Sequence, residues 1–283
     1  MPEFIEFHKV HFSYPAPSGP TIPALRGLDL TIRRGEYWVV LGRNGSGKST
    51  LARLLNGLLT PTAGRVLVDG LDTRDSAALR EVRRQVGLVF QVPDNQLIAN
   101  TVEEDVAFGP ENLGMPQEEL AERVRAALTT VGLWELRRRP PHHLSAGQKQ
   151  RVAIAGILAM RPDCLVLDEA TAMLDPAGRR DVLELVAGLH RAGATVVAIT
   201  HHMAEALTAD RVAVLHQGKL ALTDTPRAVF AQTEKLTEFG LNLPPVPALA
   251  WELHRRHPAF PANLLTVVEL AEAIRERTRV KAR

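Results

Sequence analysis

Hydrophobic residues follow two different patterns along the chain, and together these patterns predict a mixed α/β fold. Apolar and polar positions alternate within residues 4–8 and 28–32, as in strands with one buried face. Residues 37–41, 86–90, 163–167 and 195–200 are almost continuously apolar, as in strands buried within a sheet. We therefore expect residues 4–41 to form an antiparallel layer that leads into the strands of an open α/β sheet.

Helical periodicity occupies most of the intervals between these strands. Residues 51–55, 77–85, 117–131 and 176–190 are predicted helices, and residues 92–160 as a whole form a mostly helical block. Residues 212–222 read as a hairpin that closes the edge of the sheet. Beyond residue 240 the composition changes to a proline-rich linker at 243–247, followed by predicted helices at 248–256 and 266–279. The chain therefore ends in a small helical extension.

A glycine-rich loop follows the apolar run 37–41 and precedes a helix. Residues 42–50 read GRNGSGKST, which is a P-loop in the strand-loop-helix context that this motif requires. A chance glycine-rich turn is the alternative, and the flanking strand and helix argue against it. We expect Lys48 to reach the β- and γ-phosphates of a nucleoside triphosphate and the Ser49 hydroxyl to bind Mg²⁺. The other predicted phosphate-binding residues are Gly42, Asn44, Gly45, Ser46, Gly47 and Thr50.

Two carboxylates and an amide follow other buried strands. In open α/β sheets, ligand-binding residues gather at the carboxyl ends of the strands. There, Asp168 is placed to hold Mg²⁺ through water, and Glu169 to orient and deprotonate a water that attacks the γ-phosphate. Gln91 is expected to bind Mg²⁺ or to position that water, although alone it would read as a solvated loop residue.

Adjacent histidines follow the strand 195–200. His201 is expected to donate a hydrogen bond to the γ-phosphate, whereas His202 is expected to face solvent or a neighbouring residue. A metal site is disfavoured because no third ligand stands at a suitable spacing. Tyr14, just before a proline-rich loop, either stacks on an adenine ring or anchors that loop.

A second anion site is predicted at the start of the helix that ends the helical block. Ser145 and Gln148 have the spacing of a capping box, and a serine with small residues at a helix N-terminus can bind an anion. Nothing else in this chain needs a second anion site. This site is therefore the first indication that the chain serves another copy.

The composition of the chain limits the classes of function to be considered. The net charge of +2 gives no electrostatic argument for nucleic acid, and a single cysteine, Cys164, excludes an intramolecular disulfide and reads as a small buried hydrophobe. No stretch has the length of a membrane span, and the first residues lack the features of a signal peptide. Any work at a membrane is expected to be done from the cytoplasmic side through a partner.

In this order, the motifs resemble the nucleotide-binding subunits of ATP-binding cassette (ABC) transporters over residues 4–230. Residues 42–50 are similar to the Walker A motif, 144–148 to the signature motif, 165–169 to Walker B, and 172–175 to the D-loop. The resemblance implies ATP and Mg²⁺, a Q-loop at Gln91, a switch histidine at His201 and an adenine-stacking role for Tyr14. It also implies that Ser145, Gly147 and Gln148 of one subunit, with Asp175, complete the ATP site of another in a head-to-tail dimer.

A narrower resemblance is to the ATPases of energy-coupling factor (ECF) transporters, carried by residues 91–96, 101–112 and 151–156. Two positions depart from the usual pattern, because Ala146 replaces a glycine of the signature and an apolar Val92 follows Gln91. The implied fold is an α/β P-loop NTPase (ABC ATPase) core with an antiparallel β-subdomain. The implied domains are a nucleotide-binding domain at 1–235, with a helical signature subdomain at about 92–160, and a dimerising extension at 236–283.

The ECF resemblance implies a peripheral protein on the cytoplasmic face of the cell membrane that powers import of a vitamin or of a cobalt or nickel ion. Its implied partners are a second ATPase subunit, an integral transmembrane coupling protein and a substrate-binding membrane protein, without nucleic acid. Two alternatives remain. One is the ATPase of an ordinary importer served by an external binding protein, and the other is a soluble ABC ATPase acting on ribosomes or DNA.

Overall fold

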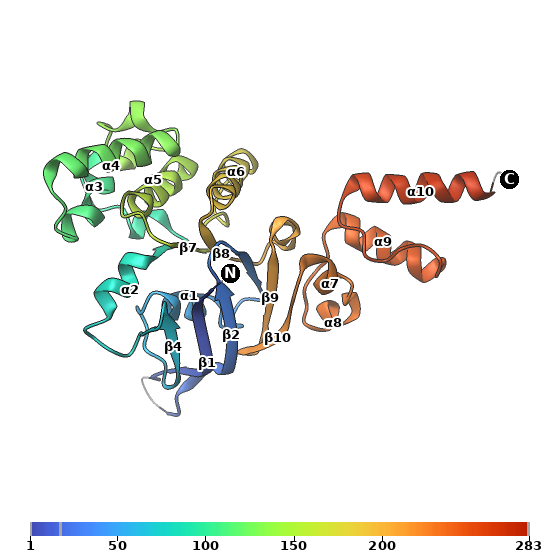
Figure 1. The fold of residues 1–283 in the computed structure, drawn as a ribbon. Helices are drawn as coiled ribbons and strands as arrows, with labels where there is room; N and C mark the ends of the chain where they lie inside the picture. Colours follow the sequence, from blue (N-terminus) through green and yellow to red (C-terminus); the bar gives the residue numbers. More distant parts are fainter. Residues whose placement is uncertain (1, 17–18, 282–283) are drawn as a thin grey trace.

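The computed structural model describes residues 2–16 and 19–281, which form two sheets, a helical block and a projecting helical extension (Figure 1). The antiparallel sheet has the strand order β2-β1-β4-β5, and the central sheet has the order β10-β9-β3-β8-β7-β6. In the central sheet, the pairs formed by β3, β6, β7, β8 and β9 are parallel, and the hairpin strand β10 closes one edge. The strands are β1 Glu3–Tyr14, β2 Ile22–Arg33, β3 Tyr37–Leu41, β4 Ala63–Val68, β5 Leu71–Asp72, β6 Val86–Val89, β7 Cys164–Asp168, β8 Thr195–Thr200, β9 Arg211–His216 and β10 Lys219–Asp224.

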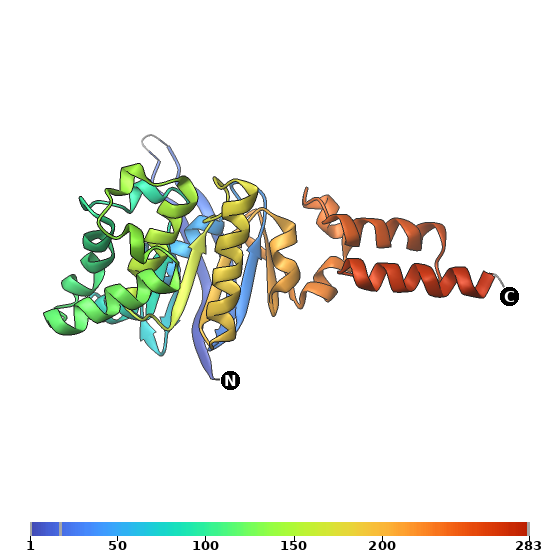
Figure 2. The same ribbon diagram turned by 90° about the horizontal axis from the view of Figure 1, so that it is seen from above.

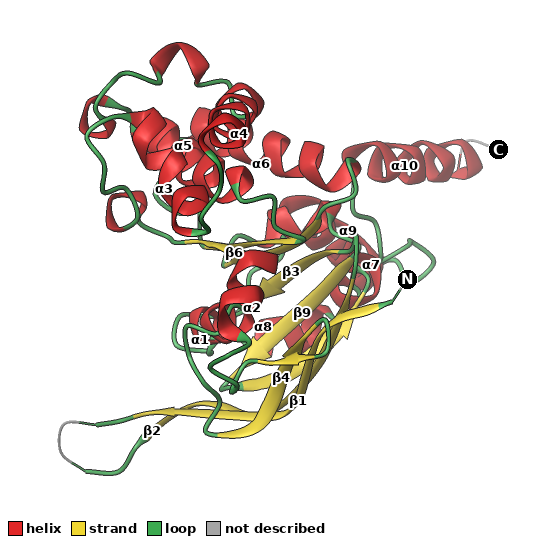
Figure 3. Cartoon of the chain, turned by 60° about the vertical axis from the view of Figure 1, so that its left-hand side comes forward, coloured by secondary structure: helices red, strands yellow, loops and turns green. Residues whose placement is uncertain are grey.

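Helices cover the central sheet and form the block beside it, which Figure 3 shows as a group of red helices next to β6. The α-helices are α1 Lys48–Leu55, α2 Leu79–Gln85, α3 Val102–Asn112, α4 Gln117–Thr130, α5 Ala146–Ala159, α6 Pro176–Arg191, α7 Pro226–Phe230, α8 Thr233–Glu238, α9 Pro245–Arg256 and α10 Val267–Lys281. Short 3₁₀ turns lie at Pro93–Asn95 (η1), Trp134–Leu136 (η2), Pro141–His143 (η3) and Met203–Thr208 (η4). Within the described residues, no helix combines the length and apolar character that crossing a bilayer requires.

The central sheet separates two hydrophobic cores because successive side chains of a strand point to opposite faces. Along β3, Val39 and Leu41 join the core shared with the helical block, whereas Trp38 and Val40 join the core shared with the antiparallel sheet and α1. Strands β7 and β8 divide their side chains in the same way. Their continuous apolar character is thus explained by burial on both faces, and Cys164 is fully buried as predicted.

The helix caps follow the sequence closely. The capping box predicted at Ser145 is confirmed, and Thr101 and Thr266 cap their helices in the same way, each of the three accepting a hydrogen bond from the backbone N–H three residues later. The predicted linker at 243–247 is wrong in its second half, because α9 already begins at Pro245. Proline suits the first turn of a helix, where its missing N–H is not needed.

The extension has a core of its own. Leu236 and Leu241 still pack into the main core, whereas Ala250, Phe260 and Leu270 form a separate small cluster. Helices α9 and α10 run side by side and project away from the sheets (Figure 2). Arg227 on α7 joins the extension to the rest of the chain by pairing with Glu269 at 2.5 Å and donating to the Asn263 carbonyl at 2.6 Å.

Candidate active site

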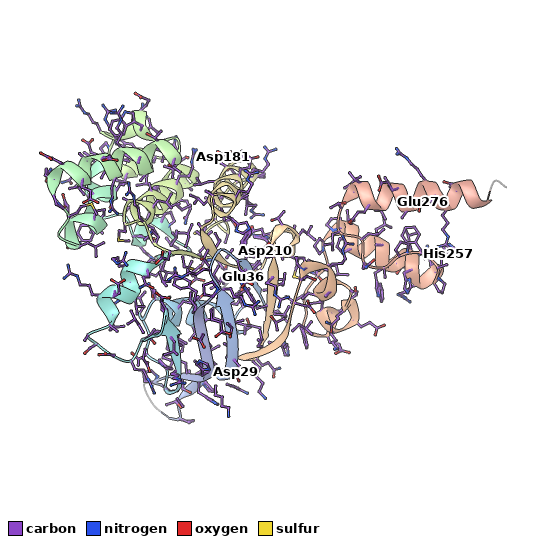
Figure 4. The ribbon with its side chains drawn as sticks, viewed as in Figure 1. Asp29, Glu36, Asp181, Asp210, His257 and Glu276 are labelled. Carbon is purple, nitrogen blue, oxygen red and sulfur yellow. The ribbon has the colours of Figure 1, made fainter. Side chains whose placement is uncertain are left out.

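The predicted catalytic residues gather at one edge of the central sheet. Strands β3, β6, β7 and β8 are parallel, so their carboxyl ends lie at the same edge, and each is followed by a predicted site residue. Glu36 and Asp210, labelled in Figure 4, precede β3 and β9 and therefore mark the opposite, amino-terminal edge. The site is thus built where open α/β sheets bind their ligands.

The P-loop turns sharply into helix α1. Gly47 has a left-handed φ of +104°, and a Cβ at this position would lie 2.6 Å from the carbonyl oxygen of Ala24. Glycine is therefore required twice, for its backbone conformation and for its lack of a side chain. The loop and the N-terminus of α1 together present backbone N–H groups and a positive partial charge, which favour an anion.

Lys48 lies inside this loop. Its side chain is 4 % exposed, and its Nζ donates to the carbonyl oxygens of Gly42 at 2.8 Å and Arg43 at 3.1 Å. Burial lowers the pKa of the Lys48 ammonium, and the nearby Glu169 carboxylate partly offsets that effect. A buried cation held by the loop is well placed to bind phosphate oxygens.

Ser49 and Asp168 form an oxygen pair between the P-loop helix and strand β7. The Ser49 hydroxyl donates to Asp168 Oδ1 at 2.9 Å. Asp168 is 4 % exposed, and burial raises its pKa although the Ser49 hydrogen bond opposes the rise. A buried carboxylate beside a hydroxyl suits a hard divalent cation, whose charge would stabilise the ionised form.

Glu169 is the centre of the site. Its carboxylate accepts a hydrogen bond from Gln91 Nε2 at 3.2 Å, lies 3.3 Å from His201 Nδ1 and lies 3.6 Å from Lys48 Nζ. Its backbone adopts a left-handed φ of 51°, which is costly for a residue other than glycine. Strain of this kind persists only where the surroundings hold it, and here the Glu169 side chain contacts Lys48, Gln91 and His201.

Tyr14 lies beside the P-loop at the end of β1. Its hydroxyl shares a 3.1 Å hydrogen bond with Thr50 Oγ1, and its ring packs edge-to-face against Phe12 with the ring centroids 4.9 Å apart. A hollow of about 430 Å³ lies between this tyrosine and the loop, and Glu169 also lines it. The hollow is also lined by Ile22, Pro23, Ala24, Asn44, Gly45, Gly47, Lys48, Ser49, Thr50 and Gln91. The adenine-stacking role of Tyr14 stays a prediction.

The signature residues lie apart from this hollow. Ser145 and Gln148 cap α5 by exchanging hydrogen bonds of 3.3 and 3.0 Å, and Asp175 caps α6 by accepting one of 2.8 Å from the Gly178 N–H. The two helix starts meet closely, because a Cβ on Gly147 would lie 3.4 Å from Gly178 Cα. Of the described residues that line the P-loop hollow, none belongs to this group. The predicted second anion site is therefore separate from the first.

Arg179 contacts the histidine pair but was not predicted from the sequence. Its Nη2 lies 2.9 Å from Nε2 of His202, whose ring also packs against that of His201 with the ring centroids 4.2 Å apart. Burial lowers the pKa of His202, and the Arg179 charge lowers it further. The prediction that His202 faces solvent or a neighbour agrees with this contact. Arg179 gave no sequence signal, because it lies on a helix after the D-loop among other basic residues.

Known proteins resemble this chain over most of its length. The ABC transporter family matches residues 25–172. The energy-coupling factor transporter ATP-binding protein EcfA1 of Symbiobacterium thermophilum is 58 % identical over 258 residues, covering 91 % of this chain and 90 % of that protein. EcfA1 of Caldanaerobacter subterraneus subsp. tengcongensis is 50 % identical over 275 residues, covering 97 % and 99 %.

Solved structures of related proteins also resemble this chain. The structure of cbiO1 from Clostridium perfringens, described as part of the ABC transporter complex cbiONQ, is 38 % identical with a TM-score of 0.74, covering 87 % of this chain and 98 % of that one. The ATP-binding cassette MJ0796, in a dimeric post-hydrolysis state bound to ADP and Pi, is 31 % identical with a TM-score of 0.71, covering 78 % and 98 %.

The α/β fold is that of an ABC ATPase. The chain belongs to the ABC transporter family of ATP-binding proteins and, within it, to the energy-coupling factor type. It is therefore an ATPase whose hydrolysis of ATP is coupled to transport. This membership confirms the fold class and the family resemblance inferred from the motifs, and it favours the ECF type over the two alternatives.

Proposed function

We propose that this chain powers import of a vitamin or a transition-metal ion by binding and hydrolysing ATP in a head-to-tail dimer of ATPase subunits. The observation that carries the proposal is the set of contacts around Glu169, which join Lys48, Gln91 and His201 beside the Ser49–Asp168 pair. Nothing in a purely structural role requires these groups to converge at one edge of the sheet.

Magnesium is the cation that this oxygen set suits. The Ser49 hydroxyl and the Gln91 amide oxygen would bind it directly, and Asp168 would hold it through water. When bound, Mg²⁺ would supply positive charge that stabilises the negative charge developing on the phosphate groups.

Each side chain of the site has its own role in the hydrolysis of ATP. Lys48 binds the β- and γ-phosphates, and Glu169 orients a water and accepts its proton as the water oxygen attacks the γ-phosphorus. The bond from that phosphorus to the β–γ bridging oxygen breaks, so the products are ADP and inorganic phosphate. His201 donates a hydrogen bond to the γ-phosphate, Gln91 positions the water, and Tyr14 stacks on the adenine.

A second ATPase subunit, either the same chain or a close relative, completes the site. Its Ser145, Gly147 and Gln148 would cover the triphosphate held by this P-loop, with Asp175 nearby, because these residues lie apart from the hollow of their own chain. We assign residues 1–235 to the nucleotide-binding domain and residues 236–283 to an extension that strengthens the dimer. The dimeric state described for MJ0796 supports this arrangement.

The membrane partners are proposed from the relatives. An integral transmembrane coupling protein would receive the movement of the helical block, and a separate substrate-binding membrane protein would select the cargo. The chain would act as a peripheral protein on the cytoplasmic face of the cell membrane. The description of cbiO1 as part of a transporter complex supports partners of this kind.

The substitution Glu169→Gln tests the proposal, because it keeps the size and one oxygen of the side chain but removes the base. The variant should bind ATP as the parent does, lose turnover, and accumulate an ATP-bound dimer detectable by light scattering after size-exclusion chromatography. Turnover at the parent rate would contradict the role of Glu169.

A further inference from the structure

The end of strand β6, just before Gln91, pairs with β7 on one side and contacts side chains on the other. Strand β6 is the last strand of the central sheet, so its outer side lacks a ladder partner among the described strands. The Gln96 side chain pairs with this side: its Oε1 accepts from the Phe90 N–H at 3.2 Å, and its Nε2 donates to the Leu88 carbonyl at 3.4 Å. The position of Gln91 therefore depends on side-chain contacts made by the residues around it.

One of these contacts comes from the signature helix. Gln150 on α5 is fully buried, and its Nε2 donates to the Phe90 carbonyl at 3.3 Å. Burying an amide costs free energy unless its hydrogen bonds are made, and Gln150 Oε1 has no partner among the described residues. A hydrophobic residue would fill the same space without that cost, so the amide is better explained by what it holds than by packing.

A second contact lies on the other side of Gln91. Lys149, the preceding residue of α5, pairs through Nζ with Asp94 Oδ1 at 2.6 Å. Asp94 lies in the turn η1, three residues after Gln91, and the Lys149 side chain is only 17 % exposed. Helix α5 packs against both β6 and η1. Figure 3 shows β6 next to the helical block. The Q-loop is thus attached to α5 before and after Gln91.

The same helix begins with the signature. Ser145 caps α5 four residues before Lys149, within about one helical turn. A hydrogen-bonded helix transmits displacement over this distance with little bending, so the signature and the Q-loop are expected to move together.

We propose that Lys149 and Gln150 are positioning residues that couple the two ATP sites of the dimer, by fixing the signature motif to the Q-loop of the same chain. The inference rests on the proposed head-to-tail dimer, in which Gln91 serves the ATP of its own chain and Ser145 serves the ATP of the other. A shift of Gln91 at one site moves the signature that covers the second site. Binding of ATP at one site therefore changes the binding of ATP at the other.

The test uses Lys149, because it is partly exposed and its substitution disturbs the packing less than one at the fully buried Gln150. ATP hydrolysis by the dimeric parent is compared with that by Lys149→Met, with the conservative Lys149→Arg, and with the charge exchange Lys149→Asp plus Asp94→Lys. The parent should show a Hill coefficient above about 1 and no greater than about 2, since two sites are coupled. Lys149→Met should lower it toward about 1 and lower kcat about threefold, with ATP affinity preserved. Lys149→Arg and the charge exchange should restore both.

Arg123→Met is the matched control. Arg123 pairs with Glu119 within helix α4 of the same block and is 16 % exposed, so it loses a comparable ion pair that does not touch the Q-loop. Its Hill coefficient should remain that of the parent. Equal cooperativity in the parent and Lys149→Met, or an equal loss in Arg123→Met, would overturn the coupling alone. A non-cooperative parent, with Glu169→Gln remaining monomeric in ATP, would overturn the proposed dimer as well.

Discussion

Ser49 Oγ donates a 2.9 Å hydrogen bond to Asp168 Oδ1, which joins the start of helix α1 to the end of strand β7. The two residues are far apart in sequence, and both are assigned to one cation. Their contact means that a single ion can reach both without rearrangement of the backbone. Burial raises the pKa of Asp168. Of the two residues, Asp168 is therefore the one whose ionised form a bound cation would stabilise more.

Asp168→Asn should therefore remove the effect of Mg²⁺ on nucleotide binding. The amide keeps the shape but lacks the charge, so we expect the affinity for ATP in excess Mg²⁺ to fall about tenfold. Calorimetric titration with Mg²⁺ and with a chelator measures the difference. A variant whose ATP affinity still rises with Mg²⁺ as much as that of the parent would disprove the assignment of Asp168.

Lys48→Ala should weaken nucleotide binding itself. Hydrogen bonds to charged groups contribute about 2 kcal/mol, so the affinity for ATP should fall by roughly thirtyfold. ADP binding should fall too, because the ammonium is assigned to the β-phosphate as well. Fluorescent nucleotide binding at equal protein stability checks the result, and unchanged affinity would show that Lys48 does not contact the phosphates.

Gly47→Ala should destabilise the chain more than Gly45→Ala. Both glycines have left-handed φ values, +104° and +80°, but only at Gly47 would a Cβ meet a backbone oxygen, that of Ala24 at 2.6 Å. The alanine at position 45 adds backbone strain alone, about 1 kcal/mol, and the alanine at 47 should cost about 2–3 kcal/mol. Urea unfolding without nucleotide separates them, and equal costs would argue against the close approach.

Glu269→Ala should loosen the extension in a pH-dependent way. Hydrogen bonds from the Leu265 backbone N–H and from Arg227 lower the pKa of Glu269 to about 2, from an unfolded value of 4.5. Because the folded pKa is the lower one, the stabilisation is present above pH 4.5 and is lost as the pH falls toward 2.

At neutral pH the variant should lose about 1 kcal/mol, since a capping contact is removed with the ion pair. Unfolding of parent and variant across this pH range measures the difference, and Thr266→Ala serves as the control that removes the cap while keeping the charge. If the difference in the free energy of unfolding between the parent and Glu269→Ala does not become smaller in acid, this account is contradicted.

Local sequence patterns predicted most of the fold and the site. Gln91, Asp168 and His201 were placed correctly at one edge because each follows a buried strand, and parallel strands bring their ends together. The capping box at Ser145 could be predicted because its hydrogen bonds join residues only three positions apart. The start of α9 was missed because a proline-rich stretch is typical of both linkers and helix N-termini.

Contacts between residues far apart in the sequence could not be predicted from local patterns. The Lys149–Asp94 ion pair and the Arg179–His202 contact join segments whose spacing carries no periodic signal. The left-handed backbone of Glu169 likewise depends on the tertiary environment, because nothing in its local sequence requires a positive φ.

The central claim is that each ATP site is shared, with the P-loop from one subunit and the signature from another. A mixture of two impaired variants tests it most directly: Lys48→Ala, whose P-loop binds ATP weakly, and Ser145→Arg, which blocks only the signature. In a head-to-tail dimer, the mixed pair has one site with an intact P-loop and an intact signature. We predict that ATPase activity of the mixture rises well above that of either variant alone. A mixture that is no more active than its components, although the parent is fully active in the same assay, would contradict the shared site.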